Sequence, residues 1–211
     1  MKSEIGCVIM ASGLAKRFGS NKLLAEFDGK PLLCRAFAVT EGLHRVVVTR
    51  STEMQALCEK YGIPVLHHAH PLRSDTVRLG LDPCPHQWRG VPGFPAMSGC
   101  VFLPGDQPLL TRKTLCCMVS AFCAEPDRKS QIFRLCEPQS GTPGSPVLFG
   151  ADYFEELRSL PEGRGGGAVV KRHAERVTLF PARHPAELMD ADTPDVLAEL
   201  KLIFQNDSFY R

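Results

Sequence analysis

The sequence predicts an α/β fold in which helices cover a mostly parallel sheet. Short apolar runs rich in β-branched residues alternate with longer helix-like segments along almost the whole chain of 211 residues. Such alternation is typical of layered α/β folds. Because 44% of the residues are hydrophobic, the chain can bury one sizeable core, and we expect a single domain over residues 1–211.

The elements follow one another from the N-terminus. Strands are expected at 5–10, 45–49, 99–103, 131–136 and 176–180, and helices at 31–40, 52–61, 73–81, 112–124, 151–160, 165–173 and 193–204. Thr111 is the expected N-cap of the helix at 112–124, and Thr193 followed by Pro194 marks the start of the last helix. The proline-rich stretch at about 82–98 is expected to be a surface loop.

Charge and composition exclude several classes of protein. A net charge of +2 gives no global field that would favour nucleic acid or an anionic membrane as a partner. The apolar run 5–13 is too short for a transmembrane helix and lacks the basic segment of a signal peptide, so a cytoplasmic location is expected.

The cysteines and histidines favour structural roles. The nine cysteines lie mostly within apolar runs, Cys116 and Cys117 among them, so we expect most to be reduced core residues. His67, His68 and His70, with Cys84 and His86, lack the spacing of a zinc site, and a polar loop is the preferred interpretation.

The first expected strand runs into a basic loop with glycines at 13 and 19. Glycine lets a backbone approach a ligand closely, and Lys16, Arg17 and Lys22 supply positive charge, so the loop could hold an anion. It matches neither the Walker A pattern nor the G-x-G-x-x-G pattern of dinucleotide sites. A solvated surface turn is the alternative.

Two acidic motifs follow at the ends of other elements. Asp106, in Pro104-Gly105-Asp106-Gln107-Pro108, comes directly after an expected buried strand, where a turn or helix-capping role is the alternative. Asp190 and Asp192 precede the last helix, which Asp192 or Thr193 could cap. Carboxylates at two such ends suggest a split Mg²⁺ site, since Mg²⁺ needs only one or two carboxylates beside water and phosphate.

Together these motifs resemble the MobA-like nucleotidyltransferases. The resemblance spans about residues 5–200 and rests on four ordered motifs: Ala11-Ser12-Gly13-x-x-x-Arg17-Phe18-Gly19-x-x-Lys22-Leu23-Leu24, Gly105-Asp106-Gln107-Pro108, Gly141-x-x-Gly144-x-Pro146-Val147-Leu148 and Asp190-x-Asp192-Thr193-Pro194. Within the family the chain is most similar to the MocA-like branch. The resemblance implies a Rossmann-like three-layer sandwich of the nucleotide-diphospho-sugar transferase type.

The resemblance also implies roles for individual residues. Arg17, Lys22 and Asp106 would be catalytic, and Mg²⁺ would be held by Asp106, Asp190 and Asp192. The nucleotide would contact Met10, Ala11, Ser12, Gly13, Arg17, Lys22, Ser74, Arg78, Gly105 and Asp106. The acceptor would contact Gly141, Gly144, Pro146 and Arg164.

The implied reaction transfers CMP from CTP to the molybdenum-molybdopterin cofactor and releases pyrophosphate. Its partners would be CTP, a molybdopterin-type acceptor and a molybdoenzyme that receives the product. Guanylyl or other nucleotide transfer, to molybdopterin or to a sugar or alcohol phosphate, stays open. So does a non-catalytic nucleotide- or cofactor-binding accessory protein, because Ala15 stands where the family commonly has a serine.

Overall fold

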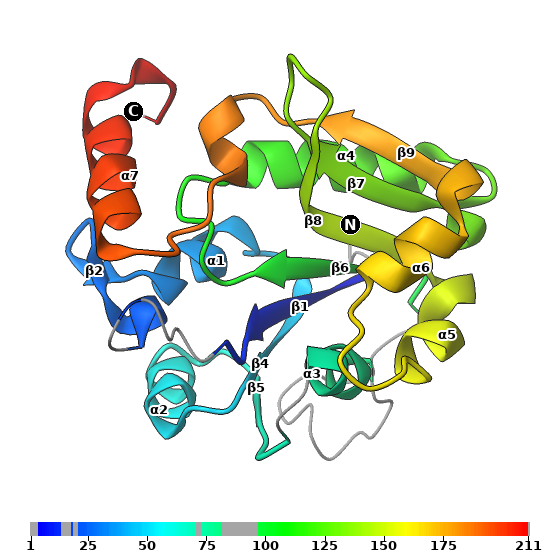
Figure 1. Ribbon diagram of the computed structural model, residues 1–211, viewed down its shortest axis with the longest axis horizontal. Coiled ribbons are helices and arrows are strands. Elements are labelled where there is room, and N and C mark those ends of the chain that lie inside the picture. The colour runs from blue at the N-terminus through cyan, green and yellow to red at the C-terminus, as the bar shows by residue number, and fades with distance from the viewer. Residues whose placement is uncertain (1–3, 14–17, 19–20, 71–72, 82–96, 211) are drawn as a thin grey trace.

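A seven-stranded sheet forms the middle layer of the part of the chain that the structure describes (Figure 1). The computed structural model describes residues 4–13, 18, 21–70, 73–81 and 97–210. The strands, in the order that they take across the sheet, are β5 (Val65–His67), β4 (His44–Thr49), β1 (Ile5–Ala11), β6 (Gly99–Pro104), β8 (Pro143–Gly150), β7 (Ile132–Cys136) and β9 (Val177–Pro181). A separate two-stranded hairpin joins β2 (Glu26–Phe27) to β3 (Lys30–Pro31). The loop expected at 82–98 lies, except for its last two residues, outside the described residues.

The prediction of a mostly parallel sheet is confirmed. The strands β5, β4, β1 and β6 are parallel, β7 is parallel to β9, and β8 runs antiparallel to both β6 and β7. The sequence did not predict β5 or β8 as strands. In β8, glycine and proline resemble a turn, but Pro146 falls at a register shift in the ladder with β7, where a missing N–H is tolerated.

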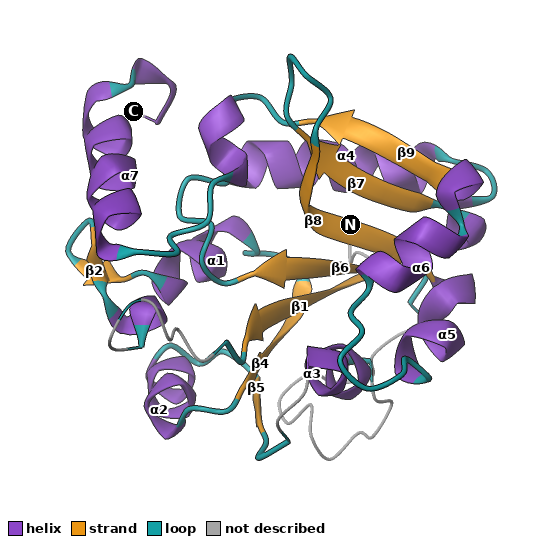
Figure 2. Ribbon diagram, in the orientation of Figure 1, coloured by secondary structure: helices purple, strands orange, loops and turns teal. Residues whose placement is uncertain are grey.

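Helices cover both faces of the sheet (Figure 2). They are α1 (Leu33–Val39), α2 (Thr52–Lys60), α3 (Arg73–Gly80), α4 (Arg112–Ala124), α5 (Phe154–Arg158), α6 (Gly167–Arg172) and α7 (Pro194–Asn206). Single turns of 3-10 helix are η1 (Lys22–Leu24), η2 (Arg128–Ser130), η3 (Ala151–Tyr153), η4 (Ala174–Arg176), η5 (Pro185–Leu188) and η6 (Ser208–Tyr210). The helix expected at 151–160 is thus divided between η3 and α5.

Two hydrophobic clusters fill the space between the sheet and its helices. One contains buried residues of α1, α2, α4 and α7, and the other contains buried residues of α3, α5 and α6. Alternate residues of β1 point to opposite clusters: Cys7 and Ile9 belong to the first and Val8 to the second. The three-layer arrangement therefore follows from the period-2 pattern of strands buried on both faces.

Local signals place the helix starts. Thr111 and Thr193 accept hydrogen bonds from the backbone N–H groups of Thr114 and Val196, as the sequence predicted. None of the described helices is long and apolar enough to cross a membrane.

Free cysteines occupy both the core and the surface. The cysteines that the structure describes form no disulfide, and burial raises the pKa of Cys7 to about 12, which keeps it a neutral thiol. The expectation of a core position is wrong for Cys116 and Cys117, which are exposed on α4. Both lie on the outer face of that helix, because Leu115 and Met118 supply its buried face.

Candidate active site

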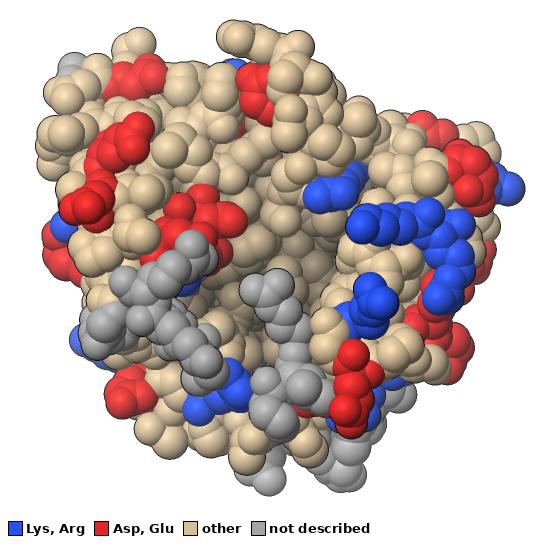
Figure 3. Space-filling model, in the orientation of Figure 1, with Lys and Arg blue, Asp and Glu red and all other residues tan. Residues whose placement is uncertain are grey.

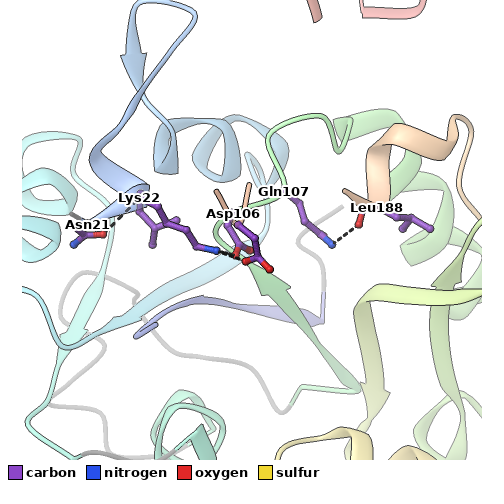
Figure 4. Close-up of polar contacts among 7 residues, drawn as sticks. Asn21, Lys22, Asp106, Gln107 and Leu188 are labelled. Carbon is purple, nitrogen blue, oxygen red and sulfur yellow. Dashed lines mark hydrogen bonds and ion pairs between the residues drawn. The ribbon is translucent and has the colours of Figure 1, made fainter. Parts of the chain in front are cut away.

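Lys22 lies between two carboxylates from distant parts of the chain. Its Nζ atom is 2.5 Å from Oδ2 of Asp106 and 2.8 Å from Oδ1 of Asp192. Figure 4 shows Lys22 reaching from its helical turn to Asp106 at the end of β6. The exposed fractions of the Lys22, Asp106 and Asp192 side chains are 13%, 19% and 42%, so the cluster is sheltered on the side of Lys22 and open beside Asp192.

A capped turn holds Lys22 in place. The Asn21 side chain accepts a hydrogen bond from the N–H of Leu23 at 3.3 Å, and its amide donates to Ser51 Oγ at 3.2 Å. Leu23 is buried in the core next to Lys22. The η1 turn is therefore anchored from two sides, and Lys22 extends from a fixed base.

Gly105 sets the position of Asp106. Its N–H donates to Met10 O at 3.1 Å, and a Cβ at this position would lie 3.0 Å from Leu33 Cδ1 and 3.2 Å from Met10 O. A side chain here would push the end of β6 away from the end of β1. The glycine lets the two strand ends converge and brings Asp106 beside the loop that follows β1.

The acidic loop before α7 is joined to Asp106 through the backbone. The N–H of Ala191, which is fully buried, donates to Asp106 O at 2.9 Å. Thr193 caps α7, so Asp192 is left to accept a hydrogen bond from Lys22. This settles the alternative that the sequence left open for the helix cap.

Glu187 fixes the other end of this loop. It is fully buried, and its Oε1 accepts hydrogen bonds from the N–H and Oγ1 of Thr111 at 3.0 and 2.6 Å. Its Oε2 accepts from Thr114 Oγ1 at 2.9 Å and from the N–H groups of Arg183 and His184 at 2.8 and 3.1 Å. Glu187 thus ties η5, and the acidic loop that follows it, to the start of α4.

The charges of the cluster depend on one another. Burial alone would lower the pKa of Lys22, but hydrogen bonds and charges from Asp106 and Asp192 outweigh it and raise the pKa. Desolvation by the surrounding protein, and next the charge of Asp106, raise the pKa of Asp190 to about 6, although the residue as a whole is exposed. The ammonium group of Lys22 is therefore held in its charged form, while Asp190 titrates closer to neutrality.

The donor set fits a hard divalent cation with few protein ligands. Among the described residues, no group of three His, Cys, Asp or Glu side chains is arranged to hold a metal ion. Asp106 and Asp192 nevertheless approach the same ammonium group, so their oxygen atoms converge on one point. Carboxylate oxygens from two residues, completed by water and phosphate, suit Mg²⁺ or Mn²⁺.

The end of β1 is braced by its neighbours and leaves Gly13 open. Thr49 Oγ1 donates to Ala11 O at 3.1 Å, and Arg50 Nε donates to Ser12 O at 3.1 Å. A Cβ on Gly13 would meet no atom of the described residues within 4 Å, so their packing does not demand glycine there. Among the described residues, this leaves room for a ligand at the backbone. Arg17 and Ala15 lie outside the described residues.

Two further predicted nucleotide contacts lie on α3. Ser74 is buried at the start of the helix, and Arg78 pairs with the buried Asp75 at 2.7 Å. A Cβ on Gly80 would lie 2.6 Å from Val8 Cγ1, so glycine allows α3 to pack directly on β1. Because α3 follows β5, which runs in the same direction as β1, the helix start lies toward the edge of the sheet at which β1 ends.

The predicted acceptor contacts come from two segments. Gly141, with φ +69°, turns the chain between β7 and β8, and Pro146 lies within β8. A Cβ on Gly144 would lie 3.1 Å from Leu188 Cδ2, which places Gly144 beside the start of the acidic loop. Arg164 is exposed in the loop before α6.

Figure 3 shows one face of the molecule, which is hollowed near its centre. Acidic side chains lie on the rim nearer α7, and basic ones lie on the rim nearer β8 and α6.

Sequence reasoning missed three residues of this region. Gln107 belongs to a sequence motif that gives it no role, yet its Nε2 donates to Leu188 O at 3.4 Å (Figure 4). Its amide is also a neighbour of Asp190. Glu187 has no role that the sequence predicts. The one signal is an acidic residue among apolar neighbours after a proline, and this indicates a buried carboxylate only weakly. The sequence suggests only a polar loop at His68, yet the residue is buried and contacts Ser12.

The family comparison agrees with this geometry. The model of the MobA-like NTP transferase domain family matches residues 7–177. The matched range contains Lys22 and Asp106 but ends before Asp190 and Asp192. None of the curated proteins matches the chain in sequence.

Solved structures share the fold along almost their whole lengths. A nucleotidyl transferase from Methanothermobacter has a TM-score of 0.75 at 20% identity, covering 95% of this chain and 97% of its own. The Rv0371c protein of Mycobacterium tuberculosis in complex with manganese has a TM-score of 0.67 at 20% identity, covering 94% and 98%. A CMP:2-keto-3-deoxy-manno-octonic acid synthetase in complex with CTP, whose organism is not named, has a TM-score of 0.70 at 14% identity, covering 98% and 100%.

Proposed function

The chain belongs to the family of MobA-like NTP transferase domains, and from that premise we propose that it transfers CMP from CTP to the phosphate of a molybdenum-molybdopterin acceptor. Pyrophosphate is the second product. We propose further that residues 1–211 act as one nucleotidyltransferase domain, since one sheet carries every described strand of the site.

The convergence of Lys22, Asp106 and Asp192 at the end of the parallel strands carries this proposal. In open α/β sheets, ligands bind beyond the carboxyl ends of the strands. A fixed ammonium group beside two carboxylates suits a triphosphate with its divalent cation. Asp106 and Asp192 would hold that cation, with Asp190 in support, and the cation would stabilise charge on the phosphates.

The proposed reaction does not require a general base from the protein. An oxygen of the acceptor phosphate forms a bond to the α-phosphorus of the nucleotide, and the bond from that phosphorus to the pyrophosphate oxygen breaks. The second pKa of a phosphate monoester is about 6, so the attacking oxygen is already ionised near neutrality. Lys22 would neutralise charge as the two anions meet, and the loop after β1 would orient the nucleotide.

The choice of nucleotide and acceptor is supported by resemblance. The motifs are most similar to the MocA-like branch, and one of the similar structures is a CMP-transferring synthetase in complex with CTP. The basic rim near β8 and α6 suits an acceptor that carries phosphate, and Arg164 is exposed in the loop before α6. A molybdoenzyme that takes up the product would be the downstream partner.

The proposal is tested by pyrophosphate release. Purified protein with Mg²⁺ is assayed with CTP, GTP and ATP, each with and without molybdenum-molybdopterin. We expect release with CTP only when the acceptor is present. Pyrophosphate release with another nucleotide, or with a sugar or alcohol phosphate as the acceptor, would show that the proposed substrates are wrong but that the protein is a nucleotidyltransferase.

A variant pair ties the activity to the cluster. Asp106→Ala should lose turnover by at least about a hundredfold, the scale for removing one electrostatic group from an active site, while circular dichroism shows an intact fold. Asp127→Ala is the matched control, because Asp127 is half-exposed and pairs with Arg176 on the surface. Nucleotide binding without turnover under every condition would favour a non-catalytic accessory protein.

A further inference from the structure

His68 presents an unused polar atom beside the loop that follows β1. It comes directly after β5, at the same edge of the sheet as Ser12, and only 7% of it is exposed. Its Nδ1 atom is buried and has no hydrogen-bond partner in the described part of the chain. A buried nitrogen without a hydrogen-bond partner destabilises the folded state, so a bound group that forms this hydrogen bond would be favoured here.

The hydrogen bonds of Ser12 decide what Nδ1 can do. Ser12 Oγ donates its single proton to Val48 O at 3.1 Å, and it lies 3.0 Å from His68 Nε2. Because that proton is used, the second contact forms only if Nε2 carries a proton and donates to Oγ. In neutral histidine the other nitrogen is then an acceptor. Nδ1 therefore requires a hydrogen-bond donor.

The surroundings keep the ring neutral. Burial is the main cause that lowers the pKa of His68, and the nearby His70 and Arg50 lower it further, against a smaller opposite effect of Asp75. The rings of His68 and His70 stack with their centroids 6.0 Å apart. A neutral acceptor of this kind suits an uncharged N–H donor better than a phosphate.

The strand order separates this position from the charged cluster. Asp106 follows β6 on one side of β1, whereas His68 follows β5, two strands away on the other side. From β6 to β5 there are three strand spacings, which are about 14 Å. A nucleotide whose phosphates lie at Lys22 and Asp106 can therefore extend across Ser12 and place its base near His68.

We propose that His68 Nδ1 accepts a hydrogen bond from the exocyclic amino group of the bound base, and so selects cytosine over uracil. This inference rests on the proposed function. Cytosine carries an amino donor at position 4, where uracil carries a carbonyl acceptor. A carbonyl facing the lone pair of Nδ1 would leave both groups unpaired, which is how a hydrogen-bonding pocket rejects an analogue.

Two substitutions distinguish a hydrogen bond between His68 and the base from a structural role of His68 in holding the loop at Ser12. In His68→Gln the side-chain amide can reach the place of Nε2 and keep the Ser12 contact, but nothing replaces Nδ1. In His68→Asn the shorter amide can place its oxygen where Nδ1 was and loses the Ser12 contact. His67→Gln is the matched control, because the neighbouring His67 is exposed.

The experiment measures dissociation constants of CTP and UTP, each with Mg²⁺, by isothermal titration calorimetry. We expect the wild type and His67→Gln to bind CTP about ten to a hundredfold tighter than UTP, the range of one buried hydrogen bond. His68→Gln should reduce this ratio to within about threefold of one, and His68→Asn should keep most of it.

Three results would overturn the inference, and they separate it from the proposed function. An unchanged CTP/UTP ratio in His68→Gln, in a protein that still releases pyrophosphate, rejects the role of His68 alone. Equal loss of the ratio in His68→Gln and His68→Asn shows that His68 acts only by bracing the loop. If the wild type binds neither nucleotide, the proposed function fails together with the inference.

Discussion

Replacing Glu187 by alanine tests whether one buried carboxylate holds the acidic loop in place. The side chain is fully buried and accepts hydrogen bonds from the backbone N–H groups of Thr111, Arg183 and His184. The hydroxyl groups of Thr111 and Thr114, 3.1 Å apart, can still pair with each other, so the three amides carry most of the loss. At about 1 to 1.5 kcal/mol for each amide left without its acceptor, the free energy of unfolding should fall by about 3 to 5 kcal/mol.

The loss is measured by urea denaturation followed by circular dichroism. The control is Glu155→Ala, because Glu155 is 84% exposed and pairs with Arg158 on the helix surface. An exposed ion pair contributes at most about 1 kcal/mol, so the control should change little. Since Asp190 and Asp192 follow Glu187 in the same loop, the folded Glu187→Ala protein should also bind nucleotide with Mg²⁺ more weakly than the control.

A different result would refute this account of Glu187. If Glu187→Ala lost no more stability than Glu155→Ala, the hydrogen bonds of Glu187 would be replaced by water at little cost. If stability fell but nucleotide affinity did not change, Glu187 would stabilise the fold without positioning the acidic loop.

Two further predictions concern titration and packing. Burial, and then Asp106, raise the pKa of Asp190 to about 6, so the folded state favours its protonated form; its ionisation should cost stability as the pH rises from about 4 through 6. Asp190→Asn should remove that part of the pH dependence in urea titrations, and an unchanged profile would contradict the raised pKa. Gly80→Ala should destabilise by about 1 to 3 kcal/mol, because its Cβ would lie 2.6 Å from Val8 Cγ1. Gly167→Ala has open space around the added carbon and should be close to neutral, and equal effects of both substitutions would contradict the packing argument.

Local rules explain why so much of the fold could be predicted. The continuous apolar run of β1 predicts that both faces of this strand are buried. The caps at Thr111 and Thr193 depend only on residues three positions away. The strand β8 was missed because its glycines and Pro146 suggest a turn. Its place between β6 and β7 depends on partners far along the chain.

The candidate site shows the same division. The sequence alone determined that Asp106 and Asp192 each stand at the end of a regular element and that Lys22 belongs to the basic loop after the first strand. Only the tertiary structure decided that Lys22 meets an aspartate 170 residues away and that Ser12 lies within hydrogen-bond distance of His68. Periodicity and capping act over a few neighbouring residues, whereas ion pairs and tautomers depend on which distant strand ends the packed sheet brings together.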